Sequence, residues 1–442
     1  MSALLLVLLL VAQEPGNELR RALAASDVRT QGLGLAAGRA GGDPLLSVGA
    51  DEPRAPASNQ KILVAAAAIA KLGRDFCFET RISVGEGGDL MVVGEGDPNL
   101  SGRFFGGDPT KVLRAMARDV KAKGVERVRD LVLDASRFDD QYIHPEWPTD
   151  QLERWYCAPV AALVYNDSCW DITVLPGSAP GAPSRLQVQP SFLSPEIANR
   201  CETVRGGKQV VHIGRAQESD FEVRGQVVLA SAGVEANVTV RDPVRFFGEA
   251  FKAALVAEGV PVDGAVRQGK LEGAREILLY RSDLARTLKV MLTNSQNLYA
   301  ECLFKRLGEG SFASGAAALA AALAAAGVPV DGLDAHDGSG LSSENRVTAR
   351  TVYGALQAMR DEPIFLDALA TGGEGTLRRR YRDLGERVHL KTGTIDGVSA
   401  LSGYVTGKEG GRYVFSILAN GKSVARARRL QDLVVTALAK CP

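Results

Sequence analysis

The sequence of 442 residues has no net charge, because 52 Lys and Arg side chains balance 52 Asp and Glu side chains. A neutral chain produces no global field that would attract a polyphosphate, so nucleic-acid binding is not expected. The six cysteines form no C-x-x-C pair and the four histidines show no metal-ligand spacing, so we expect no metal and no cofactor. No apolar run reaches the roughly 20 residues that a membrane-spanning helix needs.

One short apolar run lies at the start of the chain, over residues 3–12. It ends in Leu10-Val11-Ala12, a small-residue pattern typical of signal-peptide cleavage, although no Lys or Arg precedes it. We predict that residues 1–12 are a signal peptide and that the protein is exported, to the periplasm or to the cell wall outside the cell. An uncleaved anchor and a buried N-terminal helix are the alternatives.

An exported chain meets an oxidising environment, in which cysteines can pair. Cys169 and Cys201 lie on neighbouring strand-like segments and are the preferred pair. Buried cysteines without a disulfide are the alternative for all six.

The pattern of apolar residues divides the chain into two kinds of sequence. Residues 13–74 and 271–442 are predicted to form one domain, with short strands at 33–37 and 45–48 and a buried apolar helix at 62–70 that stops at Gly73. Further helices are predicted at 18–26, 284–292, 295–308, 315–326 and 424–438. Strands at 388–394, 399–406 and 412–419 are joined by short turns and predict an antiparallel meander.

Residues 75–270 have a different character and are predicted to be inserted, strand-rich material, which we expect to form two nested domains. Short alternating segments are separated by turns rich in Gly, Pro, Asp and Asn, and one helix is predicted at 110–123. The predicted strands are 80–84, 90–93, 128–133, 172–175, 186–188, 209–214 and 234–240.

Ser58 and Lys61 are the first residues that could perform chemistry. At positions i and i+3 of a helix their side chains share one face. Ser58 lies at the positive end of the helix dipole, and burial lowers the pKa of a lysine, so Lys61 can act as a base. The pair is a candidate serine nucleophile with its general base, although a capping serine beside a solvated lysine would show the same spacing.

Lys391-Thr392-Gly393 follows on a predicted strand, shortly before the turn at Asp396-Gly397. A positive charge, a hydroxyl and a glycine that admits a close backbone approach suit an extended peptide ending in a carboxylate.

Two S-x-N triplets complete the set. We prefer Ser295-Gln296-Asn297, which begins a helix, over Ser343-Glu344-Asn345, which follows a glycine-rich turn.

The order of these motifs resembles that of the serine penicillin-recognising enzymes. Three further segments narrow this resemblance: Gly94-Glu95-Gly96-Asp97-Pro98, residues 158–166, and residues 337–342. With them the chain is similar to the class C low-molecular-mass penicillin-binding proteins. Members of that class are D-alanyl-D-alanine carboxypeptidases that also act as endopeptidases. The resemblance covers nearly the whole chain after residue 12. It implies an α/β (α+β) fold with a transpeptidase-like antiparallel sheet flanked by helices, and nested domains between Lys61 and Ser295.

The resemblance also implies a role for each motif residue. Ser58 would attack the carbonyl of the penultimate D-alanine, and Lys61 would take its proton. Ser295 would pass a proton to the leaving amine with help from Lys391, and Asn297 would orient the substrate amide.

Three residues of the motif strand would bind substrate in the same scheme: Thr392, Gly393 and Thr394. The family pattern has Asp in many members where this chain has Gln296, and we expect a small effect. Tyr156 is either a cleft residue or an ordinary core tyrosine.

The substrate implied by the resemblance is the peptidoglycan stem peptide, with β-lactams as acylating inhibitors. A β-lactamase or an esterase on the same scaffold is the alternative enzyme, and a peptidoglycan-binding module without turnover is the alternative outside catalysis. The oligomeric state is left open.

Overall fold

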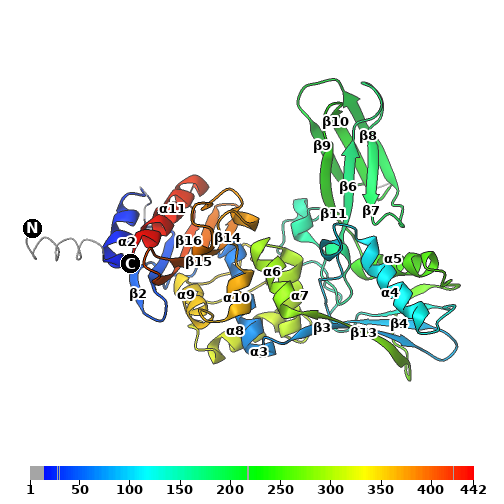
Figure 1. Ribbon diagram of the computed structural model, residues 1–442, viewed down its shortest axis with the longest axis horizontal. Coiled ribbons are helices and arrows are strands. Elements are labelled where there is room, and N and C mark those ends of the chain that lie inside the picture. Colours follow the sequence, from blue (N-terminus) through cyan, green and yellow to red (C-terminus); the bar gives the residue numbers. More distant parts are fainter. Residues whose placement is uncertain (1–13, 27, 29, 217–218, 422) are drawn as a thin grey trace, which may run out of the picture. The chain divides into compact units, whose positions relative to one another are not determined.

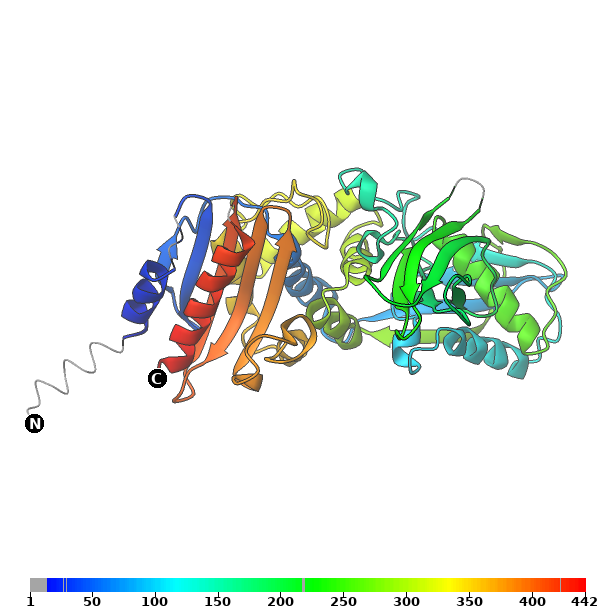
Figure 2. The same ribbon diagram turned by 90° about the horizontal axis from the view of Figure 1, so that it is seen from above.

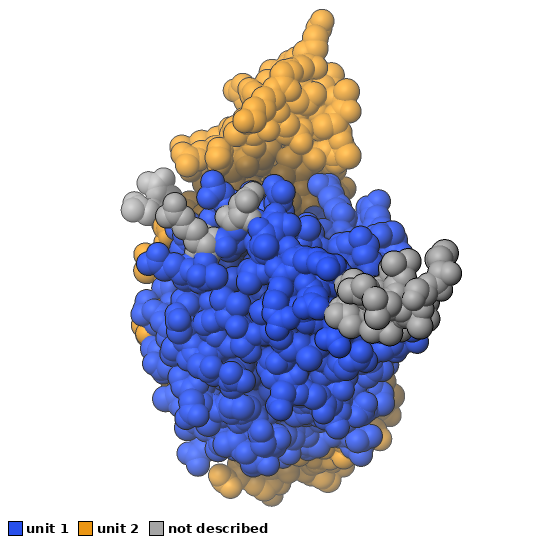
Figure 3. All heavy atoms as spheres, turned by 90° about the vertical axis from the view of Figure 1, so that its left-hand side faces the viewer, with its two compact units in different colours: residues 1–76, 283–442 blue, residues 77–282 orange. Residues whose placement is uncertain are grey.

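The computed structural model describes residues 14–442 apart from positions 27, 29, 217, 218 and 422, so the predicted signal peptide lies outside the described residues. The chain divides into two compact units, coloured separately in Figure 3. Unit 1 contains residues 1–76 and 283–442, and unit 2 contains residues 77–282. Residues 271–282 belong to unit 2 because they are largely occupied by strand β13, the outermost strand of a unit 2 sheet.

Unit 1 is built on a five-stranded antiparallel sheet with the order β14-β15-β16-β1-β2. The predicted meander is confirmed, and β14 lies at the edge of the sheet. The strands of this sheet are β1 (Leu33–Arg39), β2 (Pro44–Val48), β14 (Val388–Ile395), β15 (Val398–Thr406) and β16 (Arg412–Asn420).

Helices cover both faces of this sheet (Figures 1 and 2). β15 and β16 are buried over nearly their whole length, as expected for strands that are covered on both sides. Helices α2 and α11 pack together on one face, over a core that includes Leu35, Leu401, Ile417, Val434 and Leu438. The prediction of an antiparallel sheet flanked by helices is therefore confirmed.

The remaining helices of unit 1 include α3, which packs against α7, α8 and α9. Its apolar sequence explains its burial, and Gly73 ends it with a positive φ of 86°. Two helices of unit 1 were not predicted: α9, with ten residues, and α10, with six, give weak periodic signals. Helix α5 of unit 2 (Pro243–Ala257) was not predicted either. The helices of unit 1 are α2 (Pro15–Ala24), α3 (Gln60–Leu72), α6 (Leu284–Thr293), α7 (Asn297–Leu307), α8 (Phe312–Ala325), α9 (Ala349–Ala358), α10 (Pro363–Ala368) and α11 (Val424–Lys440).

Unit 2 contains a five-stranded mixed sheet with the order β12-β5-β4-β3-β13. Helices α4 and α5 pack against each other, and α5 also contacts β5 and β12. The elements of this part are β3 (Cys77–Val84), β4 (Leu90–Gly94), α4 (Thr110–Ala122), β5 (Leu131–Asp134), α5 (Pro243–Ala257), β12 (Val266–Gln268) and β13 (Arg275–Asp283).

Two three-stranded sheets, β8-β10-β9 and β11-β6-β7, form the rest of the regular structure of unit 2. They share one apolar core, to which Ile172, Val174, Phe221 and Val223 belong. β8 and β10 were not predicted, because polar residues interrupt their apolar positions. These strands are β6 (Cys169–Leu175), β7 (Arg185–Gln189), β8 (Ile197–Val204), β9 (Val210–Arg215), β10 (Phe221–Val228) and β11 (Val234–Thr239).

The preferred disulfide between Cys169 and Cys201 is wrong. None of the six cysteines takes part in a disulfide. Cys169 begins β6 and Cys201 lies within β8, and these strands belong to different sheets. β7 lies between these two strands in the chain and pairs with β6 but not with β8, so the two cysteines do not lie on adjacent strands.

Among the described helices, none is by itself long and apolar enough to cross a membrane. Helices α7 and α8 meet the length and composition limits only as a pair, and they are bent by 77° relative to each other.

Candidate active site

A short 3-10 turn, η1 (Ala57–Asn59), leads directly into α3 and carries Ser58. Ser58 is half-buried, whereas Lys61, in the first turn of α3, is fully buried. The backbone of Ala57 has a positive φ of 47°, which an L-residue rarely adopts. This turn places the Ser58 hydroxyl on the same side of the helix as the Lys61 amine.

The amine of Lys61 lies within hydrogen-bond distance of three oxygen atoms; in its neutral form it can donate two hydrogens, to Asn297 and Ser339, and accept one from Ser58. Its Nζ lies 3.0 Å from Ser58 Oγ, 2.8 Å from Asn297 Oδ1 and 2.7 Å from the carbonyl oxygen of Ser339. Residues from three distant parts of the sequence therefore meet at one amine.

Burial also sets the charge of this amine. Removal from water lowers the pKa of Lys61 to about 7, because desolvation outweighs the attraction of Glu301 and Asp337. A neutral amine can accept the proton of a neighbouring hydroxyl. The pair can therefore produce a serine nucleophile near neutral pH.

A second amine, that of Lys391, lies on the opposite side of the candidate site. Lys391 is fully buried on β14, and its Nζ donates to Ser295 Oγ at 2.8 Å and to the carbonyl oxygen of Thr392 at 2.7 Å. Burial lowers the pKa of Lys391 far below its usual value, and the nearby Lys61 lowers it further. Ser295 is thus hydrogen-bonded to an amine that can exchange protons.

Ser295 and Asn297 are held by the entry into α7. Ser295 has a positive φ of 61°, and Asn297 is the first residue of the helix. This bend turns the two side chains towards two different lysines, since Ser295 contacts Lys391 and Asn297 contacts Lys61. The first S-x-N triplet therefore lies between the two amines.

Strand β14 passes close to the nucleophile at Gly393. A Cβ atom at this position would lie 3.0 Å from the backbone nitrogen of Ser58 and 3.1 Å from Asn59 Nδ2. Asn59 Nδ2 also donates to the carbonyl oxygen of Lys391 at 3.2 Å. The glycine permits this approach, and the half-buried Thr392 and exposed Thr394 lie on either side of it.

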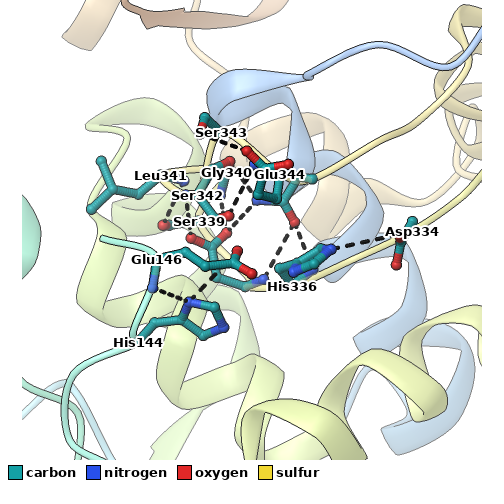
Figure 4. A network of polar contacts seen from close by, with 12 residues as sticks. His144, Glu146, Asp334, His336, Ser339, Gly340, Leu341, Ser342, Ser343 and Glu344 are labelled. Atoms are coloured by element: carbon teal, nitrogen blue, oxygen red, sulfur yellow. Dashed lines mark hydrogen bonds and ion pairs between the residues drawn. The ribbon is translucent and has the colours of Figure 1, made fainter. Parts of the chain in front are cut away.

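A loop at residues 336–345, whose polar contacts are drawn in Figure 4, supplies the carbonyl oxygen of Ser339 that contacts Lys61. Asp337 Oδ1 accepts from the backbone of Gly340 at 2.7 Å and from Asn345 Nδ2 at 2.9 Å, while Oδ2 accepts from the backbone of Ser342 at 2.7 Å. Asn345 Oδ1 in turn accepts from the backbone of His336 at 2.8 Å. The second S-x-N triplet thus ends in a buried residue that holds this loop in shape.

Glu301 is the residue of this region that the sequence analysis missed. It is fully buried on α7, and its two carboxylate oxygens accept from the backbone N–H groups of Gly338 and Ser339, each at 2.8 Å. Burial raises the pKa of Glu301, and Asp337 raises it further. Its position four residues after Asn297 was the available signal, because i and i+4 share one helix face.

The predicted residues therefore fall into two groups. The first group, which belongs to unit 1, consists of Ser58, Lys61, Ser295, Asn297 and Lys391. Hydrogen bonds join Lys61 to Ser58 and Asn297, and Lys391 to Ser295. Thr392, Gly393 and Thr394 lie on the neighbouring edge strand. Tyr156 belongs to unit 2, where its hydroxyl donates to Gln151 Oε1 at 2.8 Å.

Comparison with known proteins finds relatives that match most of the chain. The D-alanyl-D-alanine carboxypeptidase of Actinomadura sp. (strain R39) is 34% identical to this chain over 436 residues, which cover 90% of this chain and 79% of the relative. The crystal structure of penicillin binding protein 4 from Haemophilus influenzae is similar with a TM-score of 0.79 at 22% identity, over 96% of this chain and 99% of that one.

Two further solved structures are of complexes with β-lactams. That of the Haemophilus influenzae protein with a novel β-lactam has a TM-score of 0.72 at 21% identity, over 92% of this chain and 96% of that one. A penicillin G-acylated predatory endopeptidase from Bdellovibrio bacteriovorus has a TM-score of 0.52 at 14% identity, over 92% of both chains. A family model for the D-Ala-D-Ala carboxypeptidase 3 (S13) family matches residues 17–441, and this chain belongs to that family.

Proposed function

We propose that this protein is a serine-type D-Ala-D-Ala carboxypeptidase that acts on peptidoglycan stem peptides through an acyl-enzyme on Ser58. The observation that supports this most directly is the hydrogen bond of 3.0 Å between Ser58 Oγ and the buried amine of Lys61. A hydroxyl with a general base already in contact is the arrangement that nucleophilic catalysis requires.

Acylation begins when Lys61 Nζ accepts the proton of Ser58 Oγ. The oxygen then forms a bond to the carbonyl carbon of the penultimate D-alanine. The backbone N–H groups of Ser58 and Thr394 stabilise the oxyanion that develops on the carbonyl oxygen, usually a large contribution to acyl transfer. Asn297 is held by Lys61 at 2.8 Å and orients the substrate amide.

Breakdown of the tetrahedral intermediate breaks the peptide C–N bond, and the leaving amine needs a proton. Ser295 donates that proton and is reprotonated through its hydrogen bond of 2.8 Å with Lys391. The terminal D-alanine departs with this proton on its nitrogen. Water then attacks the ester carbon and gives up a proton, which returns to Lys391 through Ser295. Protonated Lys61 gives its proton back to Ser58 Oγ as the ester C–O bond breaks and the shortened peptide leaves.

The edge strand β14 supplies the binding surface for the substrate. The outer edge of β14 is bridged to Ala370 at Leu390. Beyond this bridge the strand can offer backbone groups to an extended peptide, and Gly393 leaves space for its backbone. A β-lactam would acylate Ser58 in the same way as the peptide. The proposed substrate is a cell-wall polymer, so the enzyme would act outside the cytoplasmic membrane after export.

A penicillin adduct tests the nucleophile. Trypsin releases residues 55–61 as a peptide with the sequence APASNQK, in which Ser58 is the sole hydroxyl. We expect the mass of one penicillin on this peptide, and no adduct on Ser58→Ala protein. The variant Ser343→Ala changes an exposed serine and should label normally. An adduct on another peptide, or none on the unaltered protein, would exclude this nucleophile.

Turnover is measured separately from labelling. Release of D-alanine from a stem pentapeptide should be lost in Ser58→Ala and retained in Ser343→Ala. Labelling of the unaltered protein without release of D-alanine would instead indicate a penicillin-binding module that does not turn over this substrate.

A further inference from the structure

A pocket of about 490 Å³ lies within unit 2, whereas the candidate active site belongs to unit 1. Its walls come from the first half of α5, the end of β11, the start of β10 and the loop between β7 and β8. The volume falls within the roughly 300–1,000 Å³ that is usual for small-molecule sites. We call this hollow the unit 2 pocket.

Charged side chains of both signs line the unit 2 pocket, three arginines and three carboxylates. They are Arg215, Arg241, Arg245, Asp220, Asp242 and Glu249. No ion pair joins any of these six to another in the part of the chain that the structure describes. Opposite charges that share a hollow without pairing keep hydrogen-bonding capacity for a ligand.

An unsatisfied donor belongs to the same pocket. Nη2 of Arg215 donates to Thr239 Oγ1 at 2.9 Å and to the carbonyl oxygen of Val240 at 3.1 Å, which holds the guanidinium in place. Its Nε is shielded from solvent and has no hydrogen-bond partner among the described residues. A buried donor without a partner is costly, so native proteins rarely leave one without a reason. Arg215 lines the pocket, so a ligand there can supply the missing acceptor.

One further donor and one further acceptor are left over on α5. Arg245 and Glu249 are one helical turn apart and share a face of the helix. Neither side chain makes a hydrogen bond or an ion pair with another described residue. A guanidinium only donates hydrogen bonds and a carboxylate only accepts them. A ligand that satisfies both groups must therefore donate and accept.

This combination disfavours an ionic ligand, because an anion is repelled by the carboxylates and a cation by the arginines. Hydroxyl groups both donate and accept, so a neutral molecule with several hydroxyls suits the pocket. Trp170 and Phe246, whose ring centroids lie 4.9 Å apart, add aromatic surface to it. The C–H face of a sugar ring packs on such a surface while its hydroxyls reach the charged groups.

We propose that the unit 2 pocket binds a neutral sugar unit of the glycan strands of peptidoglycan, outside the catalytic centre. The choice of this polymer rests on the proposed function, because the stem peptides that the active site cuts are attached to glycan strands. A second attachment to one polymer raises the local concentration of enzyme near further substrate. The pocket thus holds the enzyme on the wall between turnovers.

Binding of a glycan that carries no peptide tests the proposal. The probe is chitotetraose, a neutral tetrasaccharide of N-acetylglucosamine, which is titrated into the full chain in a calorimeter. We expect saturable binding at one site per chain. The variant Arg245→Ala/Glu249→Ala should raise the Kd about tenfold or more, as the loss of two hydrogen bonds to charged groups requires. Its Tm should stay near that of the unaltered protein, because neither side chain has a partner in the described fold.

The matched control is Arg118→Ala/Glu126→Ala. Both residues are exposed, belong to unit 2 and do not line the pocket, so the Kd should not change. No binding of chitotetraose, or equal binding by the two variants, would overturn the proposal. Binding of a free stem peptide but not of chitotetraose, lost in the pocket variant, would make this a peptide site and also overturn it. None of these titrations depends on turnover, so release of D-alanine tests the proposed function separately.

Discussion

At the scale of single residues, the charge of Lys61 controls the proposed chemistry. Lys61 belongs to α3, a helix whose residues are mostly apolar and buried. Burial lowers the pKa of the Lys61 amine from 10.5 to about 7. The neutral form is the base, so the active fraction grows as pH rises through this value. An ordinary exposed lysine would still be protonated in the same range.

We therefore predict that the rate constant of acylation by penicillin falls as the pH is lowered below about 7. The fall should approach about tenfold per pH unit, because only the neutral amine accepts the Ser58 proton. The measurement is the rate of labelling by a fluorescent penicillin between pH 5 and 9. A rate that stays constant across this range would contradict the assignment of Lys61 as the base.

The variant Lys61→Arg tests in a second way whether Lys61 is the base. A guanidinium remains protonated at all relevant pH values, so acylation should slow by roughly 10²- to 10⁴-fold, the usual contribution of a general base. Lys71→Arg makes the same replacement at the exposed end of α3 and should leave the rate unchanged.

At the scale of elements, the loop at residues 336–345 supports the turn that carries Ser58. Gly340 has a positive φ of 80°, and a Cβ atom there would lie 1.9 Å from the carbonyl oxygen of Ala57. Ala57 itself has the uncommon positive φ that precedes the nucleophile. The loop and the turn are thus packed so tightly that only glycine fits between them.

We predict that Gly340→Ala destabilises the protein by about 2–5 kcal/mol, from the left-handed backbone and the clash together. Labelling by penicillin should slow by more than about tenfold, because the clash displaces Ala57 and with it Ser58. Thermal unfolding and the labelling rate are the two measurements.

The control for this change is Gly327→Ala. Gly327 has a similar φ of 74° but no atom within 4 Å of the added Cβ, so it isolates the backbone cost of about 1–2 kcal/mol. Its labelling rate should be normal at a temperature where the protein is folded. Equal labelling by the two variants would show that the contact with Ala57 does not position the nucleophile.

At the scale of the whole molecule, the cysteines give no covalent support to the fold. All six lie outside disulfides, and burial raises the pKa of the Cys169 thiol well above its usual value, which lowers its reactivity. The protein is held together by its packed cores instead, in unit 1 by the sheet between its helices and in unit 2 by one five-stranded and two three-stranded sheets.

We therefore predict that a reducing agent does not change the Tm of the purified protein. Titration of the denatured, unreduced protein with a thiol reagent should find six thiols per chain, the number of cysteines in the sequence. A titration that finds four thiols, together with a Tm that falls on reduction, would show that a disulfide forms.

Much of the architecture of unit 1 could be predicted from local patterns. The meander β14–β16, the buried helix α3 and the amphipathic helix α11 have clear periodicity and clear end signals, and the structure confirms them. β8, β10, β12, β13, α5, α9 and α10 were not predicted. Short elements and interrupted alternation give weak periodic signals, but α5 has fifteen residues and was missed although the capping Asp242 and Pro243 mark its start. The proposed disulfide failed for a related reason, since pairing depends on which sheet each strand joins.

The sequence alone determined which side chains can do chemistry, because the two serines, two lysines and one asparagine of the motifs, and their order along the chain, are properties of the residues. Only the tertiary structure decided what those side chains touch. It brought Asn297 and Ser339 to the Lys61 amine and buried Glu301 behind them. The physical reason is that burial and long-range contacts set the charge of a group, and neither can be read from its neighbours along the chain.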